Sequence, residues 1–343
     1  MVLSGGVYST VWKEHKLQQI ELENGVGFRV GLLDYGATIQ SICVPANDGD
    51  LNVVLAYSDP ADYVRDAYYL GATLGRYAGR IAHGRLALSG RRYQLATGEN
   101  IHCLHGGPEG FSSRLWSTEV DATSNFATFR YESPDGEQGF PGGLAASVRY
   151  SLHGDSGLLI EYLATSDAET VVNLSNHAYF NLNGKASDIT DHSVLINADR
   201  YAVADQGGIP CGELRDVGGS RFDFRQSTLL RDRVSEEGIG ADFGYDHTFA
   251  LNRGSERMAF AAAAFAPATG LWLKVSTTQP ALQFYTGEYL GAPLMQRAGF
   301  CFEAQNFPDA PNIPGFPSAV LKPGEEYRHS ILYEFGFDAG FRI

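Results

Sequence analysis

The strongest constraint on the fold is an alternation of apolar and polar residues with a period of two. In residues 147–152 the apolar side chains occupy every second position, and residues 158–162 alternate in the same way after a turn at 153–157. Successive side chains of a β-strand point to opposite faces of a sheet. The two runs therefore predict a hairpin of half-buried strands, and the pattern indicates a β protein.

Many other segments carry the same alternation, and helical periodicity is scarce. More than ten strands favour a large antiparallel β-sandwich over a small barrel. Asp59 followed by Pro60 predicts the first turn of a short helix, and residues 232–237 predict one or two further helical turns. The remaining predicted strands span residues 27–33, 39–44, 51–55, 92–95, 127–132, 170–176, 194–197, 270–278 and 328–335.

Nothing in the sequence divides the chain into parts. We find no Ser/Pro-rich linker and no repeat of 20–50 residues, so we expect a single domain over residues 1–343. The 40 glycines, 18 tyrosines and 20 phenylalanines are typical of strands joined by many turns. A hydrophobic fraction of 44% is enough for a sizeable core.

The net charge and the cysteine pattern limit which kinds of partner and which cellular compartment the protein is expected to have. With 26 basic and 40 acidic residues the net charge is −14, which argues against nucleic acid or an anionic membrane but not against a neutral ligand. No apolar run reaches the roughly 18 residues of a membrane span, and no secretory signal is visible at the N-terminus. Four scattered cysteines without a CxxC pair fit a reducing compartment, so we expect a cytoplasmic protein.

Residues 74–85 concentrate positive charge among glycines. Arg76, Arg80 and Arg85 lie within ten residues, with hardly any acidic side chain nearby. The fixed fork of donors on a guanidinium group suits sugar hydroxyls or carboxylates. The alternative, which composition alone favours, is that these arginines are exposed or paired internally. A phosphate loop is a weak interpretation, because the Lys-Ser/Thr ending of that motif is missing.

Two histidines follow in residues 100–107. His102 and His105 are three positions apart, so in an extended strand they point to opposite faces and would need a bend to bind one metal ion. Gly106 and Gly107 predict a tight turn or a close approach of a ligand to the backbone. The alternative is a histidine at a strand end that forms only internal hydrogen bonds.

Residues 173–184 interleave asparagines and His177 with aromatic residues after a β-branched run. Asparagine donates and accepts hydrogen bonds, and an aromatic ring can stack on the apolar face of a sugar. This combination favours a polar ligand. The alternative is an asparagine-rich loop whose side chains only bond to their own backbone.

One carboxylate interrupts an apolar run near the C-terminus. Glu303 shares a strand face with Cys301 and Gln305, and an isolated carboxylate there is costly unless it is hydrogen-bonded or its pKa is raised. A functional role is therefore favoured for Glu303. Asp246 and Gln283 are weaker candidates, since each is a polar residue flanked by aromatics at the edge of a strand-like run.

These segments together resemble the aldose 1-epimerase family, also called galactose mutarotases. The resemblance implies a large β-sandwich of the galactose-mutarotase type, no cofactor and no metal. It also implies an isomerase that interconverts the α and β anomers of a free aldose such as glucose or galactose. It depends on an ordered series of short motifs along nearly the whole chain: LGATLGRYAGRI, LHGG, NLSNHAYFNLNG, ADRY with PCGEL and FDFR, YDHTF, QFYTG, EAQNFPDAPN and LKPGEEYRHS.

The resemblance also implies roles for individual residues. His177 matches the general acid, Glu303 the general base, and His105 a second active-site histidine near the ring oxygen and the anomeric centre. Gly79 departs from the pattern, because the family usually has asparagine there, and this puts the preferred sugar in doubt. The matched sugar-binding positions are Arg80, Asp246 and Gln283.

Anomer exchange requires the sugar ring to open and close again. One group takes a proton from the anomeric hydroxyl and another gives a proton to the ring oxygen, and no metal, nucleotide or covalent intermediate is needed. Our hypothesis is that ionised Glu303 accepts and protonated His177 donates, with ordinary pKa values of roughly 4.3 and 6.5. The two histidines could exchange roles.

Three other functions stay open at this point. They are a non-catalytic carbohydrate-binding module, an epimerase for another sugar on the same fold, and a metal-dependent enzyme with His105, His177 and Glu303 as ligands. The expected partner is a small monosaccharide, with no nucleic acid and no membrane. We expect a monomer or a homodimer.

Overall fold

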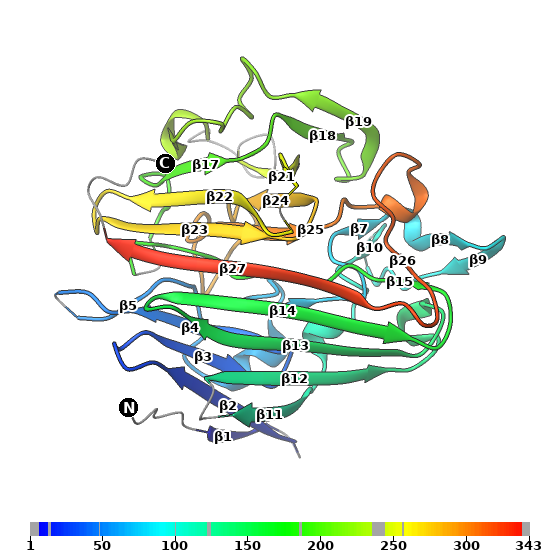
Figure 1. Cartoon of the computed structure of the whole chain (residues 1–343), viewed down its shortest axis with the longest axis horizontal. Helices are drawn as coiled ribbons and strands as arrows, with labels where there is room; N and C mark the ends of the chain where they lie inside the picture. The colour runs from blue at the N-terminus through cyan, green and yellow to red at the C-terminus, as the bar shows by residue number, and fades with distance from the viewer. Residues whose placement is uncertain are drawn as a thin grey trace.

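The computed structural model describes residues 7–12, 15–47, 49–99, 101–121, 125–184, 187–234, 244–255 and 257–337. Antiparallel strands dominate, and the largest sheet has nine strands with β27 at its middle (Figure 1). In spatial order these strands are β11 (Ser117–Asp121), β12 (Phe126–Ser133), β13 (Leu144–His153), β14 (Gly157–Ser166), β27 (Tyr327–Phe337), β23 (Leu271–Thr277), β22 (Ala259–Ala266), β17 (Ser193–Ile196) and β20 (Thr228–Leu229).

Two sheets of five strands complete the sandwich, so the predicted large antiparallel β-sandwich is confirmed. The first contains β1 (Val7–Trp12), β2 (His15–Glu23), β3 (Arg29–Leu33), β4 (Thr38–Val44) and β5 (Leu51–Asn52). The second, which carries much of the site described below, runs β19 (Pro210–Asp216), β18 (Arg200–Ala204), β21 (Asp246–Ala250), β24 (Ala281–Tyr285) and β25 (Cys301–Gln305).

Short elements connect these sheets. Four two-stranded ladders pair β6 (Thr73–Leu74) with β16 (Ser175–Asn176), β7 (Arg80–Ile81) with β10 (Cys103–Leu104), β8 (Arg85–Leu88) with β9 (Arg91–Gln94), and β15 (Thr170–Val171) with β26 (Val320–Leu321). None of the helices in the described ranges is long and apolar enough to cross a bilayer. They are the 3-10 helices η1 (Pro60–Arg65), η2 (Ala82–Gly84), η3 (Phe111–Ser113), η4 (Glu137–Gly139), η5 (Leu230–Asp232) and η6 (Ala310–Asn312).

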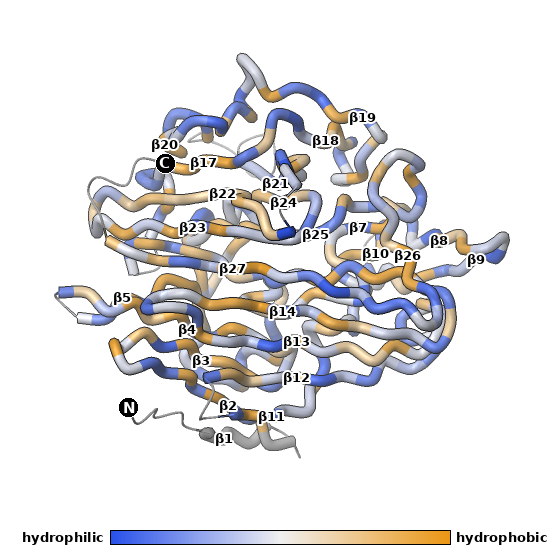
Figure 2. The backbone as a smooth tube through the Cα atoms, viewed as in Figure 1, coloured by the Kyte–Doolittle hydropathy of each residue, from blue (hydrophilic) through white to orange (hydrophobic). Residues whose placement is uncertain are grey.

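One apolar core joins the three large sheets. Val148 and Ile160 from the nine-stranded sheet, Ile39 from the first five-stranded sheet, and Phe284 and Phe302 from the second belong to one cluster of buried side chains. Along many strands hydrophobic and hydrophilic residues alternate, as the period of two predicts (Figure 2). Burial of one face of each sheet therefore fixes which side chains can face outward.

The predicted hairpin and the predicted start of the first short helix are both present. The hairpin is confirmed, because β13 and β14 pair antiparallel over their full length with Leu152 opposite Leu158. Asp59 caps η1 by accepting a hydrogen bond from the backbone N–H of Ala61 at 2.9 Å, with Pro60 as the first residue of the helix. This helix is a 3-10 helix rather than an α-helix.

Two predicted elements were wrong. A single strand over residues 170–176 does not form, because the chain changes partners there: β15 pairs with β26, whereas β16 pairs with β6. Between them the backbone of Asn173 bonds to a third segment, the carbonyl of Arg76. The helix expected over 232–237 is also wrong at its start, since η5 ends at Asp232, and residues 235–237 lie outside the described part of the chain.

Candidate active site

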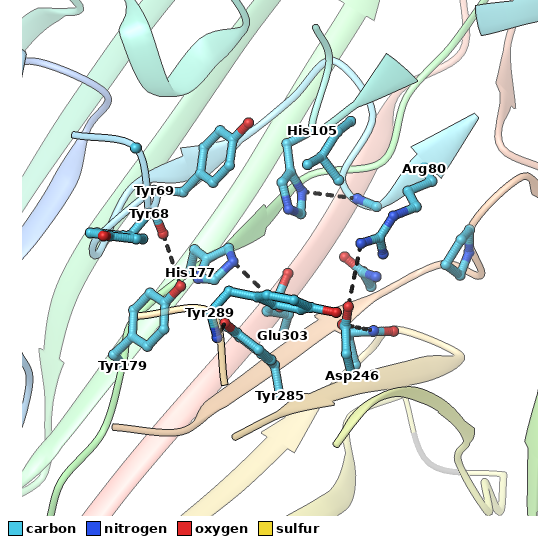
Figure 3. A pocket seen from close by; sticks show the side chains of 16 residues that line it. Tyr68, Tyr69, Arg80, His105, His177, Tyr179, Asp246, Tyr285, Tyr289 and Glu303 are labelled. Carbon is cyan, nitrogen blue, oxygen red and sulfur yellow. Dashed lines mark hydrogen bonds and ion pairs between the residues drawn. The ribbon is translucent and has the colours of Figure 1, made fainter. Parts of the chain in front are cut away.

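A cavity of about 220 Å³ brings together all six residues that the sequence assigned to the site. Its walls come from the second five-stranded sheet and from loops that are distant in sequence (Figure 3). The volume is below the roughly 300–1,000 Å³ of pockets for drug-sized ligands, so the cavity suits one small molecule. The six lining residues are Arg80, His105, His177, Asp246, Gln283 and Glu303.

Glu303 owes its orientation to strand alternation in β25. Phe302 belongs to the apolar core, so its neighbours Cys301 and Glu303 must face the other side of the sheet. That side is also covered, because ring nitrogens of His105 and His177 lie within 4.8 Å of the Glu303 carboxyl group. Ser175 of β16 donates a hydrogen bond to the backbone carbonyl of Ala304 at 2.9 Å. The side chain of Glu303 is consequently only 3% exposed, although it faces a cavity.

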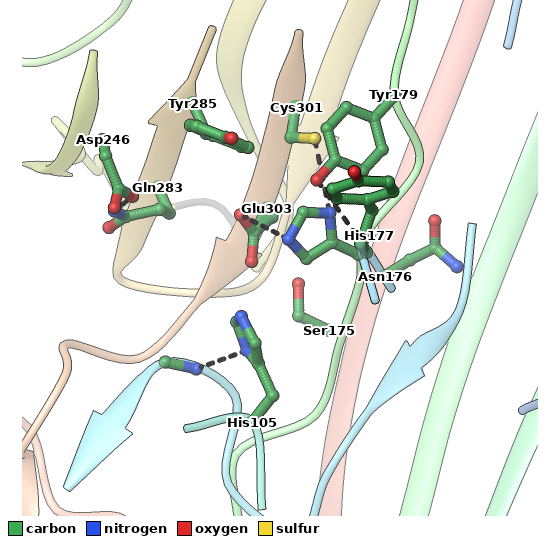
Figure 4. A network of polar contacts seen from close by, with 12 residues as sticks. His105, Ser175, Asn176, His177, Tyr179, Asp246, Gln283, Tyr285, Cys301 and Glu303 are labelled. Atoms are coloured by element: carbon green, nitrogen blue, oxygen red, sulfur yellow. Dashed lines mark hydrogen bonds and ion pairs between the residues drawn. The ribbon is translucent and has the colours of Figure 1, made fainter. Parts of the chain in front are cut away.

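His177 follows directly after β16 and is held by its backbone. Its N–H donates to the carbonyl of Ala72, and its carbonyl accepts from the N–H of Gly71. The ring lies between two side chains of β25 (Figure 4). Nε2 lies 3.7 Å from Oε1 of Glu303, and Nδ1 lies 3.4 Å from Sγ of Cys301. The edge with Nε2 therefore faces the carboxyl group.

His105 is fixed through the ladder of β7 and β10. The backbone N–H of Gly79 donates to Nδ1 of His105 at 3.1 Å, and the N–H of His105 donates to the carbonyl of Gly79 at 2.9 Å. Because Nδ1 accepts a hydrogen bond, the proton of the neutral ring belongs on Nε2. His105 can then donate from Nε2 into the cavity. The predicted tight turn is confirmed, since the N–H of Gly107 donates to the carbonyl of Leu104 at 2.9 Å. Gly106 has a φ of 91°, and the carbonyl of Gly75 leaves no room for a β-carbon on it.

Burial governs the charge of these three groups. Desolvation, helped by the negative charge of Asp246, raises the pKa of Glu303 well above its usual value. Desolvation also lowers the pKa of His177 to about 4 and that of His105 well below its usual value. The expectation of ordinary pKa values for the acid and the base was therefore wrong, because a sequence does not show how deeply a group is buried.

A second cluster of polar groups lies in the same cavity. Arg80 and Asp246 form an ion pair at 3.3 Å, and Nε2 of Gln283 donates to Asp246 at 2.6 Å. Thr248 in turn donates to Oε1 of Gln283. Burial alone would raise the pKa of Asp246, but the charge of Arg80 and the bond from Gln283 hold that pKa below its usual value. Asp246 is therefore a fixed negative charge in the cavity.

The other polar residues of the two glycine-containing segments lie elsewhere. Arg76 is buried and donates to a hydroxyl and four carbonyls of residues 133–142, so the alternative interpretation as a structural arginine holds for it. Arg85 is exposed on β8. His102 accepts a hydrogen bond from the N–H of His83 at 3.1 Å, outside the cavity. The expected divergence of the two histidines is confirmed.

Several lining residues were not singled out by the sequence. The ring of Tyr69 lies 4.7 Å from that of His105, and Tyr179 stacks on His177 at 4.8 Å. Tyr179 lies within the segment 173–184, and Gln305 shares the strand face of Glu303, so both are close to predicted site residues. For Tyr68, Tyr69 and Tyr289 the only signal was the high tyrosine count, which does not say which rings line a cavity. The additional lining residues include Tyr68, Tyr69, Tyr179, Tyr285, Tyr289 and Gln305.

His105, His177 and Glu303 could in principle hold a metal ion, since their ligand atoms lie within 4.8 Å of one another. The hydrogen bonding fits a metal poorly. A metal ion at Nε2 of His105 would have to displace the proton that the hydrogen bond from Gly79 places there. A metal ion at Nδ1 would have to displace the N–H of Gly79. The set suits proton transfer better than metal binding.

A buried carboxyl group and two imidazoles around one small cavity of a β-sandwich are an arrangement that acid–base catalysis can use. Comparison with known proteins identifies the family. The sequence profile of aldose 1-epimerases matches residues 18–334. The chain is 39% identical to an aldose 1-epimerase of Escherichia coli, covering 92% of this chain and 94% of that protein. It is 40% identical to a galactose mutarotase of Homo sapiens, covering 93% and 94%.

Solved structures of related proteins have the same fold as this chain. A galactose 1-epimerase from Lactobacillus acidophilus superimposes with a TM-score of 0.85 at 30% identity, covering 98% of this chain and 99% of that one. An aldose epimerase homologue from C. elegans gives a TM-score of 0.86 at 28% identity, covering 93% and 98%. The chain belongs to the aldose 1-epimerase family.

Proposed function

We propose that this cavity interconverts the α and β anomers of a free monosaccharide such as glucose or galactose, and that Glu303 and His177 transfer the protons. Membership of the family makes the chain an isomerase, an aldose 1-epimerase. The observation that carries the residue assignment is the convergence of Oε1 of Glu303 and Nε2 of His177, 3.7 Å apart, on the same cavity.

The chemistry needs this spacing. The anomeric hydroxyl and the ring oxygen are bonded to the same carbon, so an acid and a base must reach two neighbouring oxygens at once. Glu303 takes the hydroxyl proton while His177 gives a proton to the ring oxygen, and the ring opens to the aldehyde. After rotation about the bond to the aldehyde carbon, the reverse transfers close the ring as the other anomer.

One proton shared by the pair is sufficient for this cycle. Burial disfavours the separate charges on Glu303 and His177, but their mutual attraction at 3.7 Å offsets part of that cost when one proton has moved from the carboxyl to the imidazole. The pair is then a carboxylate beside an imidazolium, as the reaction requires. Ring opening leaves the pair with one proton again, now on Glu303, and ring closure returns the pair to its starting state.

His105 has a different role from His177. The N–H of Gly79 occupies its Nδ1, and burial together with the nearby His177 and Arg80 opposes a positive charge on its ring. We therefore assign His105 as a neutral donor that hydrogen-bonds the sugar near the ring oxygen and stabilises developing charge. Arg80 and Asp246 would bind hydroxyl groups of the sugar.

Polarimetry on freshly dissolved α-glucose or α-galactose tests this function. The protein should accelerate the approach to anomeric equilibrium, and the rate should survive EDTA. The Glu303→Gln variant should lose about 10²–10⁴-fold in kcat while its circular dichroism spectrum is unchanged. Near-normal turnover in this variant would remove Glu303 from the role of base, and sugar binding without acceleration by the unmodified protein would indicate a binding module.

The cytoplasmic location and the monomeric or dimeric state stay predictions. Fractionation of the producing cells and light scattering of the purified protein would check them.

A further inference from the structure

The cavity contains two glutamine side chains that differ in their hydrogen bonding. In Gln283, Oε1 accepts from Thr248 and Nε2 donates to Asp246 at 2.6 Å, so both ends of the amide are engaged by the protein. In Gln305, neither Oε1 nor Nε2 has a hydrogen-bond partner among the described residues. The side chain of Gln305 nevertheless lines the cavity, and the residue is 0% exposed.

An unpartnered amide in a buried position is unusual. Buried polar groups in folded proteins nearly always find a hydrogen-bond partner, since leaving one unpaired costs its full desolvation. The amide of glutamine offers two donor hydrogens and one acceptor oxygen. A sugar hydroxyl, which both donates and accepts, complements this set. Gln305 therefore has its whole amide free for a ligand, whereas the amide of Gln283 is already bonded at both ends and keeps one donor hydrogen.

The backbone of Gly79 packs closely against this amide at the wall of the cavity. Gly79 also lines the cavity, and a β-carbon on it would lie 3.3 Å from Nε2 of Gln305 and 3.4 Å from Cγ of Pro308. Its φ of 80° is in the left-handed region, which glycine adopts freely and asparagine tolerates better than most residues. A longer side chain at position 79 would therefore meet the amide of Gln305.

We propose that Gln305 is a substrate-binding and specificity-determining residue, whose amide hydrogen-bonds one ring hydroxyl of the aldose at the cavity wall that it shares with Gly79. This inference depends on the proposed function. Gln305 lies two positions after Glu303 on the same face of β25, about 7 Å along the strand. Because Glu303 acts at the anomeric hydroxyl, Gln305 contacts a hydroxyl elsewhere on the ring.

The experiment compares kcat/KM for glucose and galactose with the values for their deoxy analogues, one missing hydroxyl at a time, by polarimetry. We expect the unmodified protein to lose about 10-fold for the analogue that lacks the contacted hydroxyl, mainly through KM. Gln305→Met, which keeps the size of the side chain but not its hydrogen bonds, should no longer distinguish that analogue from the parent sugar. Its preferences at the other positions should be unchanged.

A second variant and a control complete the design. Gly79→Asn, which places an amide against Gln305, should weaken discrimination at the same hydroxyl. Gln279→Met is the matched control, because Gln279 is a buried glutamine outside the cavity that donates to Tyr327 at 3.0 Å. It should lower the melting temperature without changing the order of the analogues.

The possible outcomes separate the two proposals. If the unmodified protein accelerates no aldose, the proposed function is wrong. If it is active but Gln305→Met rejects every deoxy analogue as strongly as the unmodified protein does, the function stands and the role of Gln305 is overturned. Loss of discrimination at one hydroxyl in Gln305→Met, absent in Gln279→Met, supports the role of Gln305.

Discussion

At the scale of single residues, burial decides what each titratable group can do. Glu303 and His177 have ordinary side chains for acid–base chemistry, but in this cavity desolvation shifts the pKa of each toward its neutral form. The sequence singled out both residues, Glu303 as a carboxylate in an apolar strand and His177 through its resemblance to the family's motif. It could not give their protonation, which depends on loops packed over β25.

The pH dependence of catalysis follows from these shifts. Below the lowered pKa of His177, about 4, the imidazole takes up a second proton while Glu303 is still protonated, and the pair has no base left. We expect the acid limb of kcat/KM near pH 4, below that of an ordinary histidine. The raised pKa of Glu303 places the alkaline limb above the range of an ordinary carboxyl group.

A pH–rate profile with a parallel record of the folded fraction checks this prediction. A decline of kcat/KM centred near pH 6.5 would contradict it, because that value belongs to a histidine with an unperturbed pKa.

His105 should behave differently from His177 when it is removed. As the neutral donor that we propose, it would stabilise charge in the transition state, so His105→Ala should lower kcat by about 10²–10³-fold. In that role it takes no part in the proton balance, so the acid limb of the pH profile should stay in place. Steady-state kinetics across pH measures both effects, and a displaced acid limb in His105→Ala would assign a proton to that residue instead.

At the scale of elements, short ladders position the site more than the long strands do. The pairing of β7 with β10 places Arg80 opposite Leu104, next to His105. Strand β16, which pairs with β6, ends just before His177. Two-residue strands leave no periodic signal, so the sequence could not predict them. Strand β25 is the opposite case, since its alternation correctly placed Cys301 and Glu303 on one face.

The arginines around β7 show the same limit and give a further prediction. Arg76 and Arg85 look alike in sequence, but Arg76 donates to carbonyls of residues 133–142 from a buried position, whereas Arg85 is exposed. Arg76→Met leaves these carbonyls unpartnered, so it should destabilise the fold by about 3–5 kcal/mol. For a chain of this length, that change corresponds to a Tm lower by roughly 4–7 °C.

The matched control for this prediction is Arg85→Ala, which should change stability by no more than about 0.5 kcal/mol. Calorimetry of both variants makes the comparison, and equal melting temperatures would show that the carbonyls bonded to Arg76 find other partners.

At the scale of the whole molecule, the sandwich explains why distant motifs meet. Core burial on one face of the second five-stranded sheet leaves the other face for polar residues, and loops from the first half of the chain cover that face. The period of two was sufficient to predict this class of fold. It could not show which loops cover which sheet, because that depends on packing between segments a hundred or more residues apart.

The overall charge also has a measurable consequence. A net charge of −14 does not attract or repel a neutral sugar, so kcat/KM for glucose or galactose should change little between low and high salt. A hexose phosphate, which carries the same sign of charge as the protein, should be a poorer substrate. Polarimetry at about 10 mM and 500 mM NaCl tests this, and a steep salt dependence with the free sugar would contradict it.

The most direct test of the paired proton transfer is a double-mutant cycle on kcat with Glu303→Gln, His177→Asn and the double variant. If the two residues act as one unit, the double variant should be no slower than the slower single variant, within a few fold. If the two losses multiply instead, Glu303 and His177 contribute independently, and the mechanism of one proton shared by the pair is wrong.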